Sequence, residues 1–420
     1  MSTPEKALKS RSFSTRFAFI WMQIATEPFV AFYTLLLFIL RKDLNATALQ
    51  ISVLATLRPV LSVLSFYWSA NLLRERSKLL SNFMGAWVLS FIPFLCLPFI
   101  SNVWFVILCA GVYQLFSRAC IPSKMEILKL NLEKEPREKL FSRLYVLGFI
   151  ESICLGLFVG KLLDIYEGSW QILFALAAIL SLTSTFIQMR IPLPQNLKQD
   201  DNILPISSNR LLQPIKDSIH LMRSRPDFAR FQWGFMLGGF ALMFMTPAIH
   251  IYYADTLNLT HDNLAIARYI WMGIGVVSTS FLWRRGINRI SLSRLTAFII
   301  LGFSLFPFTL LFAMSNIFWV NIAFLFYGIA QAGSNLIWHL SGTLFAVDED
   351  SSKFSSVNIL MVGLRGLVAP VLGGICCSFF PPLTILGIGI VIGLTGVLYM
   401  LRPAPKVLPS QYPHQVHSDS

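Results

Sequence analysis

Charged residues are scarce in this sequence. Only 13% of its 420 residues are Asp, Glu, Lys or Arg, while 55% are hydrophobic, and a typical soluble domain carries roughly 25% charged residues. A soluble fold cannot bury that much apolar surface, and a disordered chain needs low hydrophobicity with high charge. The composition therefore excludes both classes and indicates an integral membrane protein.

Cysteine is also sparse, and recognisable catalytic or nucleotide-binding motifs are missing. The chain has six cysteines, with no CxxC pair and no histidine at metal-ligand spacing. There is no Walker-type glycine-rich loop, no HExxH and no GxSxG sequence. We therefore expect no metal, no cofactor, no ATP-driven step and no enzymatic activity. The cysteines, which all fall in apolar stretches, are Cys96, Cys109, Cys120, Cys154, Cys376 and Cys377.

Long hydrophobic runs are what the chain has in abundance. A helix that crosses a hydrocarbon core of about 30 Å needs roughly 20 apolar residues, and alternation of the β-barrel type is missing. We expect an all-α membrane protein with twelve transmembrane helices. The expected spans are 17–40, 49–70, 79–100, 103–122, 144–164, 169–190, 228–253, 264–283, 294–314, 317–340, 356–380 and 383–401.

Basic residues lie mostly on one side of these spans. About 27 of the 34 Lys and Arg residues fall in the termini and in alternate connections, and about 3 fall on the opposite side. The positive-inside rule therefore predicts that both termini are cytoplasmic. The net charge of +13 is explained by this topology, so it does not indicate a nucleic-acid partner.

An internal repeat divides the chain into two parallel sets of six helices. Leu44-Asn45-Ala46-Thr47 recurs 213 positions later as Leu257-Asn258-Leu259-Thr260, and Gly148 matches Gly363 at a similar offset. Both Asn-x-Thr triplets are formal glycosylation acceptors. The position of Thr47 and Thr260 at expected helix starts favours helix caps over glycosylation.

The repeat predicts four segments. These are an N-terminal six-helix bundle at 1–190, a cytoplasmic linker at 191–227, a C-terminal six-helix bundle at 228–401 and a disordered cytoplasmic tail at 402–420. Five prolines interrupt the linker, so it cannot be one continuous helix. A short amphipathic helix on the inner membrane surface is expected where apolar residues recur at helical spacing: Leu211, Leu212, Ile215, Ile219 and Met222.

The chain resembles the major facilitator superfamily over nearly all of its length. The eleventh span contains a glycine and proline pattern similar to the family's, and we expect it to permit close helix packing and a bend. Arg118-Ala119-x-x-Pro122 followed by Pro136-Arg137 is similar to the family's fourth helix and next loop. The members of the packing pattern, which surround Arg365, are Gly363, Gly366, Pro370, Gly373 and Gly374.

The sequence departs from the family at its loop signature. Leu73 stands where the signature has an Asp, and in the second half Asn288 takes that place. The resemblance implies a secondary transporter that moves a small solute by alternating access and is driven by a gradient. It also implies a monomer in the plasma (bacterial inner) membrane. The alternative is a non-transporting sensor or a lipid-handling protein with the same fold.

Polar residues inside the expected spans are the candidate solute pathway. In the resembled family, helices 1, 4, 7 and 10 line the central cavity, and each here carries polar residues at i, i+4 spacing on one face. Ionisable residues within the membrane are costly and therefore indicate function. The candidates are Gln23, Glu27, Arg58, Gln114, Arg118, Glu151, Thr246, His250, Gln331, Asn335, His339 and Arg365.

Roles can be suggested for the charged members. Glu27 or Glu151 would be the site of a coupling proton, and Arg118 or Arg365 would anchor the substrate. The excess of Arg over Glu favours an anionic solute. A structural alternative remains open, in which Glu27 pairs with Arg58, Arg118 pairs with Glu151, and the pairs tie helices together.

Overall fold

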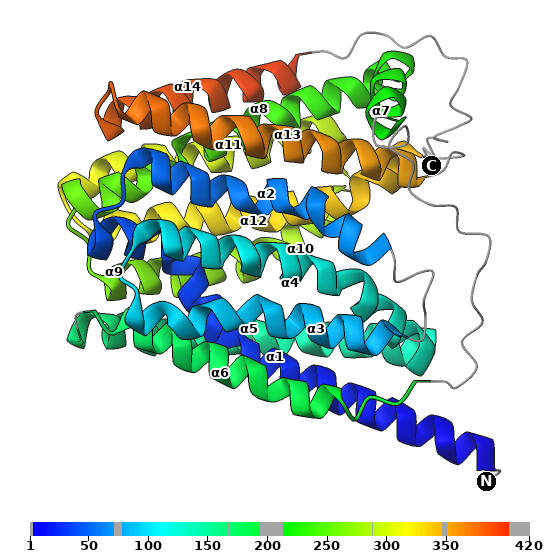
Figure 1. The fold of residues 1–420 in the computed structure, drawn as a ribbon. Helices are drawn as coiled ribbons and strands as arrows, with labels where there is room; N and C mark the ends of the chain where they lie inside the picture. Colours follow the sequence, from blue (N-terminus) through cyan, green and yellow to red (C-terminus); the bar gives the residue numbers. More distant parts are fainter. Residues whose placement is uncertain are drawn as a thin grey trace.

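The computed structural model describes residues 3–70, 78–166, 168–193, 213–287, 289–346 and 351–402. These residues form helices and turns, without a strand among them. Eleven helical segments are long and apolar enough to cross a membrane, and the apolar part of a further helix, Ala48–Leu61, adds the twelfth. The predicted multi-pass, twelve-helix architecture is therefore confirmed. The first helix begins and the last ends at the same end of the bundle (Figure 1).

Each half contains six crossings, several of them built from more than one helical segment. The N-terminal half comprises α1 (Thr3–Leu44), α2 (Ala48–Ala70), α3 (Leu79–Phe91) continued by the 3-10 helix η2 (Ile92–Phe99), α4 (Val103–Asn131), α5 (Lys134–Ile165) and α6 (Trp170–Gln188). The C-terminal half comprises α8 (Pro226–Ile251) with the π-helical η4 (Tyr252–Thr256), then α9 (His261–Ala265), π-helical η5 (Ile266–Trp271) and α10 (Met272–Ile287) as one crossing, α11 (Leu292–Leu311) with η6 (Phe312–Met314), α12 (Phe318–Phe345), α13 (Ser351–Cys377) and α14 (Pro382–Leu401).

The segment 123–143, expected to be a loop, is mostly helical. Helix α4 continues to Asn131 and α5 begins at Lys134, so both extend beyond the apolar spans. The extensions are rich in Lys, Glu and Leu, which favour helices. Pro136 does not prevent this, because a proline in the first turn lacks only an N–H that has no partner within the helix.

The linker contains the short helix expected from its apolar spacing. Helix α7 (Gln213–Ser224) buries Leu221 and Met222 against the C-terminal half, while Ile215 and Ile219 are exposed. Leu211, Leu212 and the remainder of 194–212 lie outside the described residues, as do 71–77 with Leu73, Asn288, and the tail from 403.

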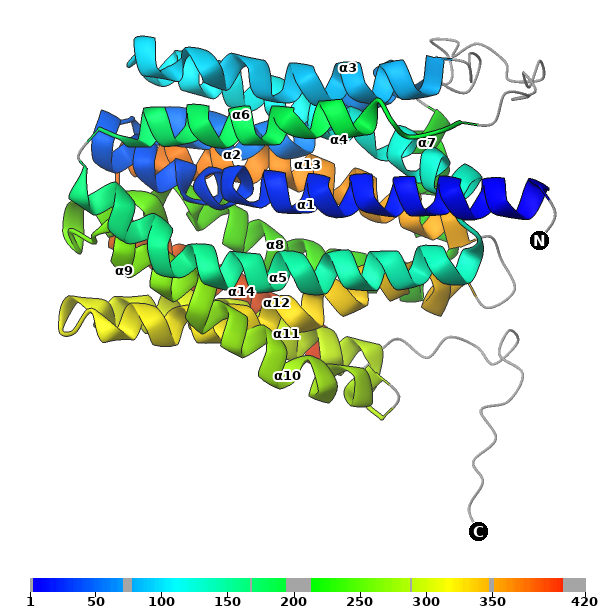
Figure 2. The same ribbon diagram turned by 90° about the horizontal axis from the view of Figure 1, so that it is seen from below.

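Helices of the two halves meet along two principal contacts, α2 with α13 and α5 with α9 and η5. In Figure 1, α6 and α14 lie at opposite edges, and α2 and α13 lie side by side between them. Figure 2 shows α5 beside α1 of its own half. Helix α5 also contacts α9 and η5 of the C-terminal half. The halves are therefore in contact through helices in the middle of the molecule, and their outermost helices stay apart.

The buried apolar side chains fall into three clusters. The largest contains residues of both halves from the end of the molecule where α1 meets α2, such as Phe38, Ile51, Tyr253 and Leu264. Near the chain termini each half has a separate cluster of its own, one around Phe83 and one around Phe228. Among the described side chains, the hydrophobic core is thus continuous between the halves at the end where α1 meets α2 and forms separate clusters near the chain termini.

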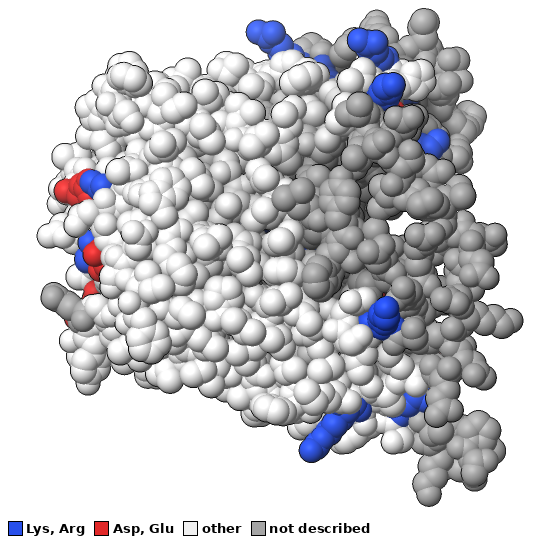
Figure 3. Space-filling model, in the orientation of Figure 1, with Lys and Arg blue, Asp and Glu red and all other residues white. Residues whose placement is uncertain are grey.

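The surface matches a protein surrounded by lipid. On the face drawn in Figure 3, the described Lys and Arg side chains lie at the end that holds the chain termini, and mixed charges lie at the opposite end. The wide band between them is uncharged on that face. Large apolar side chains such as Phe158, Phe186 and Val391 are exposed on the surface of the protein, as expected where hydrocarbon replaces water. We call the mixed-charge end the outer end, following the positive-inside rule.

The sequence repeat is also a repeat of backbone conformation. Asn45 and Asn258 are the non-glycine residues with positive φ among those described, at 51° and 46°. Asparagine tolerates this left-handed conformation better than most residues. Two equivalent turn hydrogen bonds follow, Ala46 N to Leu40 O and Leu259 N to Tyr253 O, both 2.9 Å. The tandem architecture therefore has a structural counterpart at the first outer turn of each half.

The two threonines of these triplets cap helices, as the sequence favoured. Thr260 Oγ1 accepts a hydrogen bond of 3.1 Å from Asn263 N at the start of α9. Thr47 Oγ1 accepts from Gln50 N, and Gln50 Oε1 in turn accepts from Thr47 N at 2.9 Å. This reciprocal pair is a capping box, so both turns end in a defined helix start.

Glycines at equivalent positions bring the halves into close contact. Gly160 of α5 lies against the backbone of Asp262 and against Ala265, and Gly374 of α13 lies against the backbone of Ala48 and against Ser52. Neither site has room for a β-carbon unless a helix moves. Close backbone approach of this kind is what small residues permit between membrane helices.

We expect Gly160→Ala to lower the stability of the closed outer end by about 1–3 kcal/mol, because the added methyl group overpacks the α5–α9 contact. Gly387→Ala is the matched control, since the space around Gly387 in α14 is open and alanine favours helix. The apparent melting temperatures of the purified variants check this. Equal melting temperatures for the two variants would contradict it.

Candidate functional site

A polar cluster lies at the contact between α1 and α5. Glu27 is 8% exposed, and its carboxylate accepts a hydrogen bond of 2.8 Å from Gln23 Nε2 and another from Ser152 Oγ. Gly148 leaves the space that the Gln23 amide occupies. The i, i+4 spacing predicted from sequence therefore places Gln23 and Glu27 on one face, and α5 supplies the third polar group.

Tyr113 of α4 links this cluster to the basic residues of the N-terminal half. Its side chain lies within electrostatic range of Glu27, Arg58 and Arg118. Its ring centroid is 4.7 Å from that of Tyr33. The Tyr33 hydroxyl accepts a hydrogen bond of 2.9 Å from Gln114 Nε2. Helices α1, α2 and α4 thus bring polar and charged side chains together in the interior of this half.

The two ion pairs considered from sequence are not formed. Glu27 is bonded to Gln23 and Ser152 instead of Arg58. Arg118 and Glu151 form no ion pair with each other. One carboxylate oxygen of Glu151 is buried without a hydrogen-bond partner among the described residues. Arg118 and Arg58 are instead close enough for their positive charges to repel.

The polar residues of the C-terminal half form smaller groups. Gln331 Nε2 donates to Asn335 Oδ1 at 2.8 Å along α12, and His250 Nδ1 lies 2.8 Å from the backbone oxygen of Thr246 in α8. The side chain of His339 lies outside the described part of the structure. These two hydrogen bonds lie within single helices and do not join α8 or α12 to a neighbouring helix.

Arg365 is held inside the C-terminal half. It is 9% exposed, its Nη1 donates to the backbone oxygen of Phe235 at 3.0 Å, and its guanidinium lies 5.1 Å from the centroid of the Phe235 ring. Gly239 provides the space for the guanidinium. Arg365 therefore ties α13 to α8.

The packing pattern of α13 faces two different neighbours. Gly366 lies against Pro59 of α2, and Gly373 lies against the backbone of Phe244 in α8. Gly363 has open space around it. Pro370 lies within the continuous helix. Together with Gly374, this pattern joins α13 both to its own half and to α2 of the other half.

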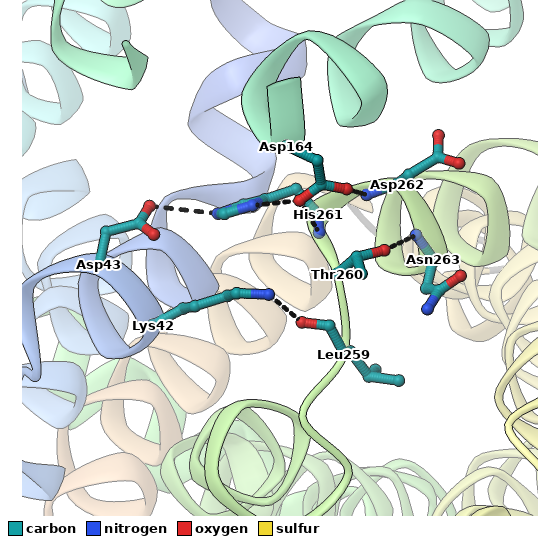
Figure 4. Close-up of polar contacts among 8 residues, drawn as sticks. All are labelled: Lys42, Asp43, Asp164, Leu259, Thr260, His261, Asp262 and Asn263. Carbon is teal, nitrogen blue, oxygen red and sulfur yellow. Dashed lines mark hydrogen bonds and ion pairs between the residues drawn. The ribbon is translucent and has the colours of Figure 1, made fainter. Parts of the chain in front are cut away.

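Polar contacts between the halves are concentrated at the outer end, in residues that the sequence did not single out. There, His261 at the start of α9 lies between two carboxylates of the N-terminal half (Figure 4). Its Nδ1 is 2.9 Å from Asp164 Oδ1 of α5, and its Nε2 is 3.1 Å from Asp43 Oδ2 of α1. Asp164 also accepts backbone hydrogen bonds of 2.9 Å from His261 N and Asp262 N.

Two further contacts extend this network across the outer end. Arg41 forms an ion pair with Asp255 of η4, and Lys42 Nζ donates to the backbone oxygen of Leu259. Tyr269 of η5 also joins the halves, since its hydroxyl donates a hydrogen bond of 2.6 Å to the backbone oxygen of Ala31 in α1. The hydrogen bonds between the halves, among the described residues, thus lie in the part of the molecule where the hydrophobic core is also continuous.

A family model agrees with this arrangement. The model of the Major Facilitator Superfamily matches residues 19–364, which is most of the chain. The chain belongs to the major facilitator superfamily. It is therefore a membrane transporter by family and has no enzymatic activity.

Solved structures of superfamily members share the fold. A nucleoside transporter, NupG, matches with a TM-score of 0.69 at 12% identity, covering 94% of this chain and 100% of NupG. A peptide transporter, POT, in complex with sulfate matches with a TM-score of 0.67 at 12% identity, covering 92% and 94%. The xylose transporter XylE from E. coli, in a partially occluded inward-open conformation, matches with a TM-score of 0.58 at 16% identity, covering 94% and 98%. No curated protein is a significant match by sequence.

Several residues described above were not predicted from the sequence, and most of them carry little signal of their own. Tyr33 and Tyr113 look like ordinary aromatic residues in apolar helices, although Gln114 beside Tyr113 marks a polar face. Asp43, Asp164 and His261 end or begin helices at short outer turns, and they are 97 to 218 residues apart in the chain. Their clustering depends on how the two halves meet, for which the sequence of each turn carries no signal.

We expect Glu27→Leu to destabilise this transporter by about 1–3 kcal/mol, because the donors of Gln23 and Ser152 lose their buried acceptor. Glu27→Gln keeps an acceptor oxygen and should cost less. The apparent melting temperatures of the purified variants in detergent give the comparison. A melting temperature of Glu27→Leu equal to or above that of Glu27→Gln would contradict this prediction.

Proposed function

We propose that this transporter is a proton-coupled secondary carrier of a small organic anion and works by alternating access. Its pathway would lie between the two six-helix bundles, at 1–190 and 228–401. The polar residues predicted from sequence would line the pathway together with Tyr33 and Tyr113. The observation that carries the anionic preference is the placement of Arg118 beside Arg58 without a carboxylate paired to Arg118 among the described residues.

The anchor for the solute is assigned to Arg118. Arg118 is half-buried and Arg58 is exposed, and an anion bound at Arg118 would offset the repulsion between the two guanidinium groups. Guanidinium groups bind carboxylate and phosphate through paired hydrogen bonds. Arg365 is less suited to this role, because its guanidinium already donates to Phe235 O and packs on the Phe235 ring.

The coupling proton is assigned to the carboxylates of α1 and α5. Glu151 lies within electrostatic range of Glu27 and has a buried oxygen without a hydrogen-bond partner. A proton bound at this pair would remove the repulsion between them and supply the missing donor. Glu151 belongs to α5, which contacts α9 and η5 of the other half, so the charge state of the pair can influence how the halves meet.

The conformation favours the inward-open state of the alternating-access cycle. Contacts and hydrogen bonds join the halves at the outer end, and near the chain termini the two halves have separate apolar cores. In this proposal both termini are cytoplasmic, the protein acts as a monomer, and it resides in the plasma (bacterial inner) membrane. A single chain would contain the whole pathway.

The structural neighbours do not decide the solute. Their names describe carriers of peptides, nucleosides and xylose, which are chemically diverse, and identities of 12–16% extend only to the fold. The class of solute proposed here comes from the side chains of this chain.

The test is uptake into proteoliposomes of small carboxylates, phosphate esters and neutral sugars under an inward proton gradient. We expect one of the anions to accumulate, and a protonophore should abolish this accumulation. In Arg118→Gln the apparent affinity for the anion should be weaker by about tenfold or more, because one charge-assisted contact is lost. Arg294→Gln removes the same charge from an exposed site near the inner end of α11 and should transport normally. Wild-type affinity in Arg118→Gln, or uptake that is insensitive to the protonophore, would contradict the proposal.

A further inference from the structure

The outer network contains a histidine whose two ring nitrogens both face carboxylates. His261 is 4% exposed, with Asp164 Oδ1 at 2.9 Å from Nδ1 and Asp43 Oδ2 at 3.1 Å from Nε2 (Figure 4). A neutral imidazole carries one N–H, and an ionised carboxylate only accepts hydrogen bonds. Only the doubly protonated imidazolium can donate to both aspartates at once. The distances therefore allow a protonated imidazole to donate to both aspartates.

This proton would join the two halves of the transporter. Asp43 and Asp164 belong to α1 and α5 of the N-terminal half, and His261 begins α9 of the C-terminal half. The contact of Asp164 with the C-terminal half does not depend on the ring proton alone, because the backbone N–H groups of His261 and Asp262 also donate to its carboxylate. These backbone groups do not titrate. The contact with Asp43 has no such support, so the loss of the second ring proton would place a nitrogen lone pair against the Asp43 carboxylate and weaken that link.

Other charged groups lie around His261, and one carboxylate oxygen of the adjacent Asp262 is buried without a hydrogen-bond partner among the described residues. From α1, Lys42 donates to Leu259 O and Arg41 pairs with Asp255 of η4. From α5, Lys161 lies within electrostatic range of Asp262. On its own crossing, Arg268 lies within electrostatic range of Tyr253 and His250. The edge of the Phe38 ring covers the imidazole at 5.4 Å between centroids.

The equivalent contact on the other side of the molecule has no histidine or carboxylate among the described residues of α2 and α13. By the internal repeat, the α5–α9 contact at Gly160 corresponds to the α2–α13 contact at Gly374, where Ala48 takes the place of His261. The histidine with its two carboxylates therefore belongs to the α5–α9 contact, and the α2–α13 contact has no counterpart of it among the described residues. A change of proton occupancy at His261 would act on one side only.

We propose that His261, bridged by Asp43 and Asp164, is a proton-binding site that holds the outer gate closed. Proton binding stabilises the state that is closed outside, and proton release allows the outer end to open. Histidine suits this task because it changes charge between about pH 5 and pH 8. The inference rests on the alternating-access function proposed above and adds a proton site remote from Glu27 and Glu151.

The test measures the outer opening without any solute. Spin labels at Ser101→Cys, between η2 and α4, and Ser315→Cys, between η6 and α12, report the distance between the halves across the outer end, since both positions are exposed. The native cysteines are replaced by alanine, and the labelled protein is reconstituted in lipid. Distance distributions by electron-electron resonance are then recorded at pH 5.5 and pH 8.

In the otherwise native chain, we expect the ratio of closed to open populations to fall at least about tenfold between pH 5.5 and pH 8, equivalent to about 1.4 kcal/mol. His261→Gln should remove this pH dependence. Asp43→Asn should also remove the pH dependence, but with the outer end closed at both pH values, because the introduced amide can donate a hydrogen bond to a neutral imidazole. His220→Gln, on the exposed surface of α7, is the control and should retain the full response.

Three outcomes would overturn the proposal: a pH-independent distribution in the unaltered chain, a full pH response in His261→Gln, or an open outer end in Asp43→Asn at low pH. These outcomes differ from a failure of the transport function. If the protein does not alternate access at all, no long-distance population appears at either pH. If the protein alternates access without using His261, both populations appear and their ratio is the same with and without the His261→Gln substitution.

Discussion

A polar group within hydrocarbon must find a partner inside the protein, and the rest of this structure follows from that constraint. The backbone meets it by forming helices, with asparagine-containing turns and capped helix starts at two equivalent outer positions. Polar side chains meet it by facing one another between helices. The described surface between the two ends is uncharged on the face drawn in Figure 3, and the polar contacts described above lie between helices and at the ends of the bundle.

The same constraint makes the contacts between the halves informative. At the outer end, glycines allow α5 and α13 to approach the opposite half so closely that backbones touch, and an apolar core crosses the boundary. A polar network is added on the α5 side alone. A transporter that rocks about this boundary would break the polar contacts and rebuild them in each cycle, while the apolar contact at Gly374 can serve as a pivot.

In the N-terminal half, the charged residues Glu27 and Arg118 lie close to other polar and charged groups without forming an ion pair with each other. Glu27 is satisfied by neutral donors, and Arg118 lies near another arginine. A pathway of paired charges would be static, because each pair would satisfy itself. In the proposed function, Arg118 would receive the solute and Glu27 with Glu151 would receive the proton, while Arg365 stays bound to Phe235.

The sequence by itself determined the twelve crossings, the tandem repeat and the threonine caps, because hydrophobic length and local turn chemistry act over a few residues. It also placed Gln23 and Glu27 on one face, since their spacing is helical. Only the tertiary structure decided which charges meet. It separated Arg118 from Glu151, turned Arg365 onto α8 and brought Asp43, Asp164 and His261 together. Those relations depend on the rotation and depth of whole helices, which are set by close packing between halves that lie some two hundred residues apart in the chain.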